Sequence, residues 1–514
     1  VRYKYDLPLL DDDGNPVYPL KTIITVRLVD GSYVPLDEYE NNPDAYEPER
    51  YKSGKRKDEL KTRQERVPDT SQPPRRQREE GYYTFQGFTE PREEWATARE
   101  GVWSTASNVI ESLGNSGVPF LELMTRQAAL LKDMNTYYYS EPDKNGQTRG
   151  MLTLLGDDNI VHHNLNMVAT VTARLSSSAP NLQNIPREGK SAVKETFVSR
   201  FGDDGVIVSS DFSSLEVYVQ AIITGATQLV EDLAAGLDMH CVRLAAKTGR
   251  PYEEIYDLAK VQKIPEWEEA REGAKIYSFQ RAYGAGLQTI AASTGMSLAD
   301  VEKLAEAEDE RYPEISLFYE NLMETVRNNR VPTGRIEEHP EQRGLTVQLG
   351  RSHFRTPDGK VYSMSEHPSP KYLLERGVLT GFSPTELRNY PIQGTGAEFT
   401  KAAMSLLVRV FFRSENFGGK AFLINQVHDQ VLIDCHKSEL KRVIHYVHAC
   451  MMEASTYMEW LFNWKLPIGV PSDTTYGKSW AEEHSLELDD DVLQKIRVWL
   501  RRVYMNNHTP SFEE

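Results

Sequence analysis

The pattern of apolar and polar positions predicts helices over much of the chain. Apolar residues recur at helical spacing in several stretches, which we expect to form helices at about 103–139, 213–224, 226–330 and 394–414. A Gly-Asn-Ser-Gly run at 114–117 breaks the first stretch into two helices. Because proline is disfavoured inside a helix, Pro391 predicts that its neighbours lie at or near the start of the last one.

Two segments have the character of strands. Residues 206–208 are apolar, which predicts a buried strand over 206–209, shortly before Asp211. Residues 421–434 form two apolar runs around the pair His428-Asp429, which predicts a β-hairpin with this pair at its tip. Strands interrupted by a long helical block predict an α+β fold.

The ends of the chain are more polar than its middle. Residues 1–48 mix short β-like runs with turn dipeptides, and residues 49–80 are highly charged with almost no apolar residues. This composition predicts an exposed loop or linker at 49–80, with a contact to DNA phosphates as the alternative. We expect the polar final segment to be peripheral. The chain begins with Val1 and no targeting segment follows, so we expect a processed product or a piece of a longer one.

The composition excludes several classes of protein. The 3 cysteines include no CxxC pair, which argues against a disulfide framework and a thiolate zinc site and favours the reducing cytoplasm. No apolar stretch of about 18 residues is present, so we expect no membrane span. The formal net charge of −17 argues against general coating of nucleic acid, which requires cations. The placement of individual cations therefore matters more than their sum.

Two aspartates are the first candidates for chemistry. Taken singly, Asp211 after a strand and Asp429 at a hairpin tip are each more typical of turn or cap residues. If both lie at one edge of a common sheet, they form a hard oxygen site suited to Mg²⁺. Two such ions about 4 Å apart would hold the attacking and leaving oxygens of a phosphoryl transfer.

A second candidate is a helix face. Arg271, Lys275, Phe279 and Tyr283 are four residues apart, so in a helix they share one face about 18 Å long. Two cations followed by two aromatic rings suit a nucleoside triphosphate, with phosphates at the basic end and the base against the rings. A half-exposed helix stripe without a ligand is the alternative.

Two polar segments complete the set. Residues 172–186 are rich in side-chain hydrogen-bond donors and lack carboxylates, as expected of a loop that faces phosphates or a groove. Residues 388–396 carry amides that can cap a helix or face a nucleic-acid minor groove. A plain polar loop is the alternative for the first segment.

Taken together and in this order, these segments resemble the polymerase module of family A DNA polymerases, the class of bacterial DNA polymerase I and the T7-like phage replicases. The resemblance covers about 103–480. It rests on five segments: the Arg-Leu-Ser-Ser to Asn-Ile-Pro string at 174–186, motif A at 211–216, the fingers helix at 271–283, motif C at 428–430 and the closing Gly-Lys-Ser-Trp at 477–480.

The resemblance implies a right-hand polymerase with a palm β-sheet, a helical fingers insertion and a reduced or partial thumb. It divides the chain into five parts: an N-terminal extension or insertion at 1–100, a thumb remnant at 101–139, a first palm segment at 140–225, the fingers at 226–385, and a second palm segment with a C-terminal tail at 386–514. The implied activity is template-directed 5′–3′ addition of dNTPs to a primer 3′-hydroxyl in DNA replication. The expected location is the cytoplasm, or the host cytoplasm if the chain is phage-encoded.

The resemblance also assigns roles in metal and nucleotide binding. Asp211, Asp429 and the Phe212 carbonyl would hold two Mg²⁺ ions. Phosphates would be bound by Arg271, Lys275 and His240, with Lys275 also giving a proton to pyrophosphate. The incoming nucleotide would be contacted by three further residues: Phe279 on its sugar and base, Tyr283 beside the templating position, and Glu216 as the gate against a ribose 2′-hydroxyl.

Four residues would contact the DNA by the same resemblance. Arg174, Gln393 and Asn389 would bind minor-groove acceptors, and His428 would contact the primer terminus. The chain departs from the family at Gln430, where motif C usually has Glu, and in motif A, which has Phe212, Ser214 and Tyr218 in place of Tyr, Gln and Arg.

The family's thumb and proofreading exonuclease are largely unmatched. We therefore expect an upstream subunit or domain that carries them, or a processivity factor, besides primer–template DNA and dNTPs. Two other functions stay open: a single-subunit RNA polymerase relative, and a non-catalytic DNA-binding replication subunit. Glu216 favours DNA synthesis over the first, and the presence of both aspartates with Lys275 and Arg271 argues against the second.

Overall fold

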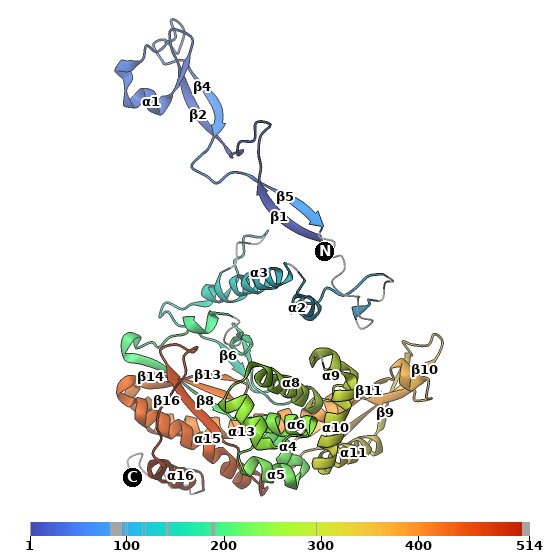
Figure 1. The fold of residues 1–514 in the computed structure, drawn as a ribbon. Coiled ribbons are helices and arrows are strands. Elements are labelled where there is room, and N and C mark those ends of the chain that lie inside the picture. The colour runs from blue at the N-terminus through green and yellow to red at the C-terminus, as the bar shows by residue number, and fades with distance from the viewer. Residues whose placement is uncertain are drawn as a thin grey trace. The chain divides into compact units, whose positions relative to one another are not determined.

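The computed structural model describes residues 2–82, 95–97, 99, 101–115, 117–118, 120–139, 142, 144–186, 191–294 and 296–505. The chain divides into two compact units, Val1–Gln127 and Ala128–Glu514. Figure 1 labels the elements of both. No helix in the described ranges is long and apolar enough to cross a membrane.

The first unit is built mainly from strands. An antiparallel pair joins β1 (Arg2–Pro8) to β5 (Arg76–Tyr82), and a three-stranded sheet has the order β3 (Tyr33–Pro35), β2 (Leu20–Arg27) and β4 (Thr62–Pro68). Its helices are α1 (Leu36–Asn41), a 3₁₀ turn at Pro43–Ala45 and α2 (Ser107–Asn115), and α3 (Leu121–Asp133) crosses the boundary to the second unit. The end of α2 and the start of α3 confirm the predicted break near 114–117.

The prediction of a loop or linker over 49–80 is wrong. This segment contains β4 and most of β5. Their charged side chains are tolerated because the strands are largely exposed and pair across the sheet, as Arg78 does with Asp6 (Nε–Oδ1 2.9 Å). Composition alone cannot predict cross-strand ion pairs, so a charged strand has the same composition as a solvated loop.

The second unit is organised around a five-stranded antiparallel sheet. The strand order is β13 (Ala421–Val427), β14 (Gln430–His436), β8 (Gly205–Phe212), β15 (Ser472–Gly477) and β16 (His484–Ser485). The predicted strand before Asp211 and the predicted hairpin around His428-Asp429 are both confirmed.

Helices cover one face of this sheet, as Figure 1 shows. They are α4 (Leu215–Thr224), α13 (Pro384–Arg413), α15 (Leu440–Phe462) and α16 (Asp490–Met505). Side chains alternate along a strand, so Val206, Val208 and Phe212 of β8 join the core beneath these helices, whereas Ile207 belongs to a smaller cluster with Trp480. Asp211 lies in phase with Ile207, on the face that α13 and α15 leave open.

The expectation that the final segment is peripheral is wrong. Helix α16 contributes Trp499 and Leu500 to the main core. The Glu453 side chain of α15, which is 0% exposed, accepts hydrogen bonds from Arg497 (2.9 Å) and Arg501 (2.7 Å) of α16. The other polar residues of α16, among them Lys495 and Arg502, are exposed, and its amphipathic spacing distinguishes it from a polar tail.

Helix α13 starts earlier than predicted. It begins at Pro384 and carries Pro391 inside it rather than at its start. The Ser383 hydroxyl accepts a hydrogen bond from the Glu386 amide and caps the true beginning. Pro391 is itself buried, so packing compensates for the helix hydrogen bond that its missing N–H cannot make.

The long helical region between 226 and 330 is confirmed. It comprises α5 (Thr227–Ala234), α6 (Met239–Thr248), α7 (Tyr252–Tyr256) with a π-turn at Asp257–Val261, α8 (Pro265–Ala282), α9 (Leu287–Thr294), α10 (Leu298–Arg311) and α11 (Pro313–Asn328).

The Gly- and Pro-rich segment that follows forms a four-stranded sheet that the sequence analysis did not predict. Its order is β12 (Thr380–Phe382), β11 (Val361–Pro368), β10 (Thr346–Arg355) and β9 (Val331–Glu338), with α12 (Lys371–Leu374) before β12. Buried and exposed residues alternate along β11. Gly344 and Gly359 have positive φ in the turns that join these strands.

The remaining elements are short. They are β6 (Asn164–Asn166) paired with β7 (Ser176–Ser178), a π-turn at Met134–Tyr138, the left-handed turn α14 (Glu415–Gly419), and 3₁₀ turns at Met151–Leu154, Leu182–Asn184, Val193–Thr196, Gly202–Asp204 and Lys437–Glu439.

The buried position of Glu453 predicts its contribution to stability. Glu453→Gln leaves two arginines without their carboxylate, so we expect the free energy of unfolding to fall by about 2 kcal/mol. Urea unfolding followed by tryptophan fluorescence measures this change. The matched control is Glu487→Gln, because Glu487 is exposed. Equal unfolding midpoints for the two variants would contradict the anchoring role of Glu453.

Candidate active site

The structure brings Asp211 and Asp429 together. Asp211 lies near the end of β8 and is paired in register with Gln430, the first residue of β14. A turn of only two residues, His428 and Asp429, joins β13 to β14, so Asp429 lies next to Asp211. His428 has a positive φ of 57°, a conformation that suits the first position of a tight hairpin turn.

Burial and the closeness of the two carboxylates make it unfavourable for both to be ionised. Burial raises the pKa of Asp211 to about 7, and the negative charge of Asp429 adds to this effect. Burial also raises the pKa of Asp429. The Oδ1 atom of Asp211 is buried and has no hydrogen-bond partner among the described residues. A bound cation would compensate both the crowded charge and the unpaired oxygen.

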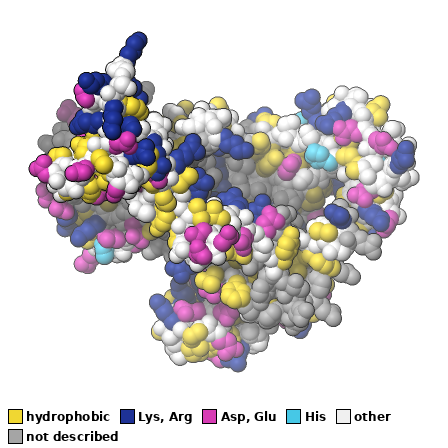
Figure 2. All heavy atoms as spheres, turned by 90° about the horizontal axis from the view of Figure 1, so that it is seen from above, with side chains coloured by type: hydrophobic (Ala, Val, Ile, Leu, Met, Phe, Trp, Pro, Cys, Tyr) yellow, Lys and Arg dark blue, Asp and Glu magenta, His cyan; other side chains and the backbone are white. Residues whose placement is uncertain are grey.

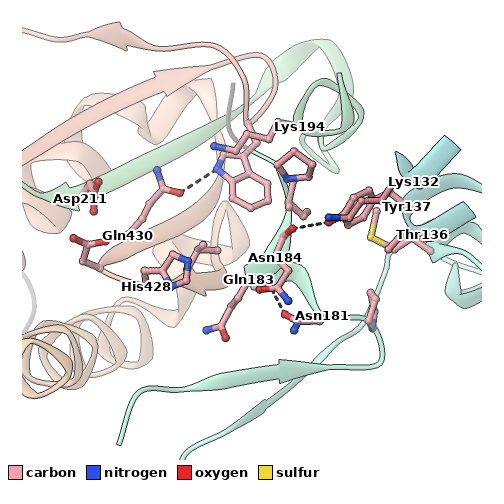
Figure 3. A pocket seen from close by; sticks show the side chains of 17 residues that line it. Lys132, Thr136, Tyr137, Asn181, Gln183, Asn184, Lys194, Asp211, His428 and Gln430 are labelled. Carbon is pink, nitrogen blue, oxygen red and sulfur yellow. Dashed lines mark hydrogen bonds between the residues drawn. The ribbon is translucent and has the colours of Figure 1, made fainter. Parts of the chain in front are cut away.

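A cleft of about 800 Å³ opens beside this pair (Figure 3). Asp211, Asp429, His428 and Gln430 line it from the sheet. The other residues labelled in Figure 3 supply two cations, three amides, one hydroxyl and one phenol: Lys132, Lys194, Asn181, Gln183, Asn184, Thr136 and Tyr137. The cleft therefore combines a carboxylate pair with cationic and amide donors.

Gln430 is fixed at the floor of the cleft. Its Oε1 accepts a hydrogen bond from the Trp480 indole N–H (3.1 Å), and its Nε2 donates to the Ser209 hydroxyl (2.7 Å), as the indole contact in Figure 3 shows. The Lys194 ammonium lies 5.0 Å from the Trp480 ring centroid. Sequence reasoning noted Gln430 as a departure but gave it no partner, because both contacts come from residues distant in the chain.

Glu216 is the centre of a three-residue network. Its carboxylate accepts hydrogen bonds from Arg174 (3.0 Å) and from the Tyr283 hydroxyl (2.7 and 2.6 Å). Burial, reinforced by the charge of Glu216, raises the pKa of Tyr283, so its hydroxyl stays protonated and donates. The network ties α8 to α4 and to the loop that carries Arg174.

Arg271 and Lys275 both lie on α8 as predicted, but Arg271 is bound to another side chain of the protein, Asp238. Its guanidinium donates to both carboxylate oxygens of Asp238, with Nη2–Oδ2 at 2.6 Å. Burial alone would raise the pKa of Asp238, but the hydrogen bonds from Arg271 lower it. The same Asp238 carboxylate caps α6 through the His240 and Cys241 amides. Asp238 is not among the predicted site residues, although an acidic residue just before a helix is a recognisable cap signal.

The other predicted nucleotide-binding residues lie close to this pair. Lys275 makes a contact of 3.4 Å with Glu272 on the same helix and is partly exposed. The His240 ring lies 3.3 Å from the Ser278 hydroxyl, and burial lowers the pKa of His240 to about 4, so the ring is neutral near pH 7. The Phe279 side chain lies outside the described part of the structure.

Two amides and one carbonyl complete the predicted set. Asn389 and Gln393 are both half-buried on α13, and the Asn389 Oδ1 is a buried oxygen for which the described residues provide no hydrogen bond. The Phe212 ring packs in the core against Phe399, with centroids 6.5 Å apart, so only its main chain is available to the site.

Comparison with known proteins identifies the family. The sequence profile of DNA polymerase family A matches residues 83–482. The chain belongs to DNA polymerase family A. DNA polymerase I of Lactococcus lactis subsp. cremoris is 25% identical over 383 residues, covering 74% of this chain and 36% of that protein.

Other family A relatives match over a similar span. The thermostable DNA polymerase I of Thermus aquaticus is 26% identical over 386 residues, covering 74% of this chain and 38% of its own. The DNA polymerase of Bacillus phage SP01 is 24% identical over 383 residues, covering 72% of this chain and 37% of its own. The chain thus spans little more than a third of the length of these relatives.

A solved structure confirms the fold. The polymerase domain of Pol1 from M. smegmatis, in complex with a DNA primer–template and dNTP, aligns with a TM-score of 0.52 and 22% identity. The alignment covers 75% of this chain and 58% of that one. The predicted α+β polymerase fold is therefore confirmed, whereas the boundaries of palm, fingers and thumb stay predictions.

The raised pKa of Asp211 predicts a pH-dependent stability. In the unfolded chain the carboxyl loses its proton near its ordinary pKa of 3.8, but in the folded chain it keeps the proton to about pH 7. Raising the pH from 4 to 7 therefore destabilises the fold through this group. Asp211→Asn cannot ionise, so with EDTA present we expect it to be about 2–4 kcal/mol more stable than the unchanged chain at pH 8.

This advantage should shrink as the pH falls towards 4. Thermal unfolding of both proteins at several pH values measures it, with Asp203→Asn, at an exposed position before β8, as the control. A stability difference that does not change with pH would contradict the buried charge at Asp211.

Proposed function

We propose that this chain is a DNA-directed DNA polymerase that adds dNTPs to a primer 3′-hydroxyl on a template strand. The observation that carries the proposal is the adjacent, half-buried pair Asp211 and Asp429, which lines the cleft of about 800 Å³, in a chain of family A. Nucleotidyl transfer needs such an oxygen site beside a cavity with cationic walls, because the substrates are polyphosphates.

The residues at the pair fit divalent metal ions. The unpaired Asp211 Oδ1 and the crowded carboxylates are hard oxygen donors of the kind that Mg²⁺ prefers. In proteins, Mg²⁺ is commonly held by one or two carboxylates and completes its coordination with water and substrate phosphates. Asp211, Asp429 and the Phe212 carbonyl would hold two Mg²⁺ ions. Bound there, the ions would lower the pKa of the primer hydroxyl and neutralise the pyrophosphate leaving group.

The incoming nucleotide would lie along α8. Lys275 is partly exposed and paired only loosely, so it is available to bind phosphate and to give a proton to the leaving pyrophosphate. Arg271 would exchange Asp238 for phosphate oxygens, since both offer the paired acceptors that a guanidinium binds. The neutral His240 ring would donate a hydrogen bond without adding charge, and Phe279 would pack on the sugar and base.

Selection of the sugar would depend on Glu216. Arg174 and Tyr283 hold its carboxylate from two sides, so it cannot rotate away to admit a larger group. A fixed carboxylate of this kind would exclude a ribose 2′-hydroxyl, and Tyr283 would at the same time define the position of the templating base.

Primer–template DNA would occupy the cleft. Lys132 and Lys194 would meet its phosphates, His428 the primer terminus, and Arg174, Gln393 and Asn389 the minor groove. On the face drawn in Figure 2, lysine and arginine side chains are interspersed with acidic ones, so a net charge of −17 is compatible with local cationic sites. An upstream subunit or domain, or a processivity factor, stays a prediction.

The carboxylate pair predicts the outcome of a charge-neutral substitution. Asp429→Asn keeps the shape of the turn but halves the charge that would hold the ions, so we expect extension of a primed template to fall by about 1,000-fold or more. DNA binding should change little, because the phosphate contacts come from other residues. Primer extension and equilibrium DNA binding measure the two effects, and Asp203→Asn serves as the control. Retained extension would refute the metal assignment.

The network around Glu216 predicts a change in sugar selection. We expect Glu216→Ala to raise the incorporation of ribonucleotides relative to deoxynucleotides by about ten-fold or more, because it opens space at the sugar. Tyr283→Phe keeps the carboxylate and its Arg174 partner, so its effect should be smaller. Single-nucleotide extension with dNTPs and rNTPs measures the ratio. An unchanged ratio in Glu216→Ala would remove this residue from the gate, and a preference for rNTPs in the unchanged chain would favour an RNA polymerase.

A further inference from the structure

The turn between β10 and β11 reaches helix α13 next to Gln393. The Lys360 ammonium in this turn donates a hydrogen bond to the carbonyl oxygen of Gly394 (2.5 Å) and pairs with Glu398 (Nζ–Oε1 2.7 Å). The Lys360 side chain is only 20% exposed, so these contacts are largely shielded from solvent. The four-stranded sheet is thereby fastened to α13 one residue after Gln393.

The Tyr362 side chain also packs against Gly394. Its ring stacks between Phe354 and Tyr390, with centroids 5.1 and 5.7 Å away. A Cβ atom at Gly394 would lie 1.6 Å from the Tyr362 hydroxyl oxygen, so only glycine allows this contact. The hydroxyl is buried without a hydrogen-bond partner among the described residues. An unpaired buried hydroxyl reduces the stability of the fold, so we look for a role of the Tyr362 hydroxyl other than stabilisation.

The same Cβ position on Gly394 also meets the segment that carries Arg174. The carbonyl oxygen of Thr172 lies 3.5 Å from the same Cβ position, and Thr172 is 8% exposed. Gly394 is therefore enclosed between the hairpin of the four-stranded sheet and the start of the Arg174 loop. Three residues before Gly394, Pro391 cannot donate the helix hydrogen bond to the Leu387 carbonyl, so α13 lacks one of its own hydrogen bonds on the N-terminal side of this junction.

We propose that Lys360 and Tyr362 are positioning residues that set the spacing between Arg174 and Gln393. Each of these two donors lies within two residues of the enclosed Gly394 junction. Minor-groove acceptors of a correct base pair occupy fixed places, so two donors can test them together only if their separation is held to a fraction of an ångström. The hairpin thus contributes to the recognition of a correctly paired primer terminus without touching DNA. This inference rests on the proposed polymerase function.

The variants that test this role are expected to fold. Tyr362→Phe removes only the unpaired hydroxyl and keeps the ring stack, so its stability should be equal or higher. Lys360→Met removes the ammonium that pairs with both Glu398 and the buried Asp358. Glu398 keeps Lys401 as a partner (3.2 Å), and Asp358 keeps the hydrogen bond from the Thr356 hydroxyl. Matched controls come from the exposed α12, as Tyr372→Phe and Lys371→Met. Thermal unfolding checks that all four proteins are folded.

The test compares matched with mismatched primer termini. In the full protein, the ratio of kcat/KM for extension of the two termini should fall by about ten-fold in Lys360→Met and by less in Tyr362→Phe. The control variants should keep the ratio of the unchanged protein. The ratio of the dissociation constants for matched and mismatched primer–templates provides a second readout that needs no catalysis.

A double-mutant cycle separates positioning from general damage. Because the proposed effect passes through Gln393, adding Lys360→Met or Tyr362→Phe to Gln393→Ala should lower the ratio no further. An unchanged ratio in both single variants, or the same loss in the Gln393→Ala background, would overturn the positioning role. A protein that binds primer–template with discrimination but extends no primer would overturn the proposed polymerase function instead.

Discussion

The register between β8 and β14 is the constraint on which the active site depends. Pairing Asp211 with Gln430 across the strands places Asp429, in the adjoining turn, against a second carboxylate. A slip of one residue would turn Asp211 towards the helix-covered core and replace it on the open face with an apolar or hydroxyl side chain. The apolar alternation that buries Val206 and Val208 therefore fixes both the core and the position of the charges.

The helical block depends on a second set of fixed charges. Glu308 of α10 accepts hydrogen bonds from the buried Arg243 of α6 and from Tyr277 of α8. Together with the network of Glu216, this fastens α8 at its middle and near its C-terminal end. Arg271 and Lys275, the cations that we propose to bind nucleotide phosphates, thus lie on a helix that largely buried carboxylates hold in place. The net acidity of the chain includes these structural groups.

The sequence allowed prediction of the elements whose pattern is local. The hairpin at His428-Asp429 and the strand before Asp211 follow from alternating apolar runs, and their motif spacing pointed to the correct family. What could not be predicted was long-range. β5 could not be distinguished from a solvated linker because its ion pairs join distant residues, as between Arg78 and Asp6, which are 72 positions apart.

Within the site, the residue types were predictable but their partners were not. The spacing of Arg271 and Lys275 located both on one helix face, yet the pairing of Arg271 with Asp238 depends on how α6 packs beside α8. Likewise Pro391 was a sound local signal for a helix start, and it failed because burial in the core outweighs one missing hydrogen bond. The chemistry of a side chain determines which kinds of interaction it can make, whereas tertiary packing determines the partner.

The ion pair between Arg271 and Asp238 has a consequence for ligand discrimination. A guanidinium that already has a two-oxygen acceptor gives it up only for a ligand that offers more negative charge at a comparable geometry. A nucleoside or a monophosphate at this position would have little advantage over Asp238, whereas a triphosphate would exceed it. In the proposed function, Asp238 would therefore compete with the ligand for Arg271, and it would keep the proposed phosphate subsite closed to anions of lower charge.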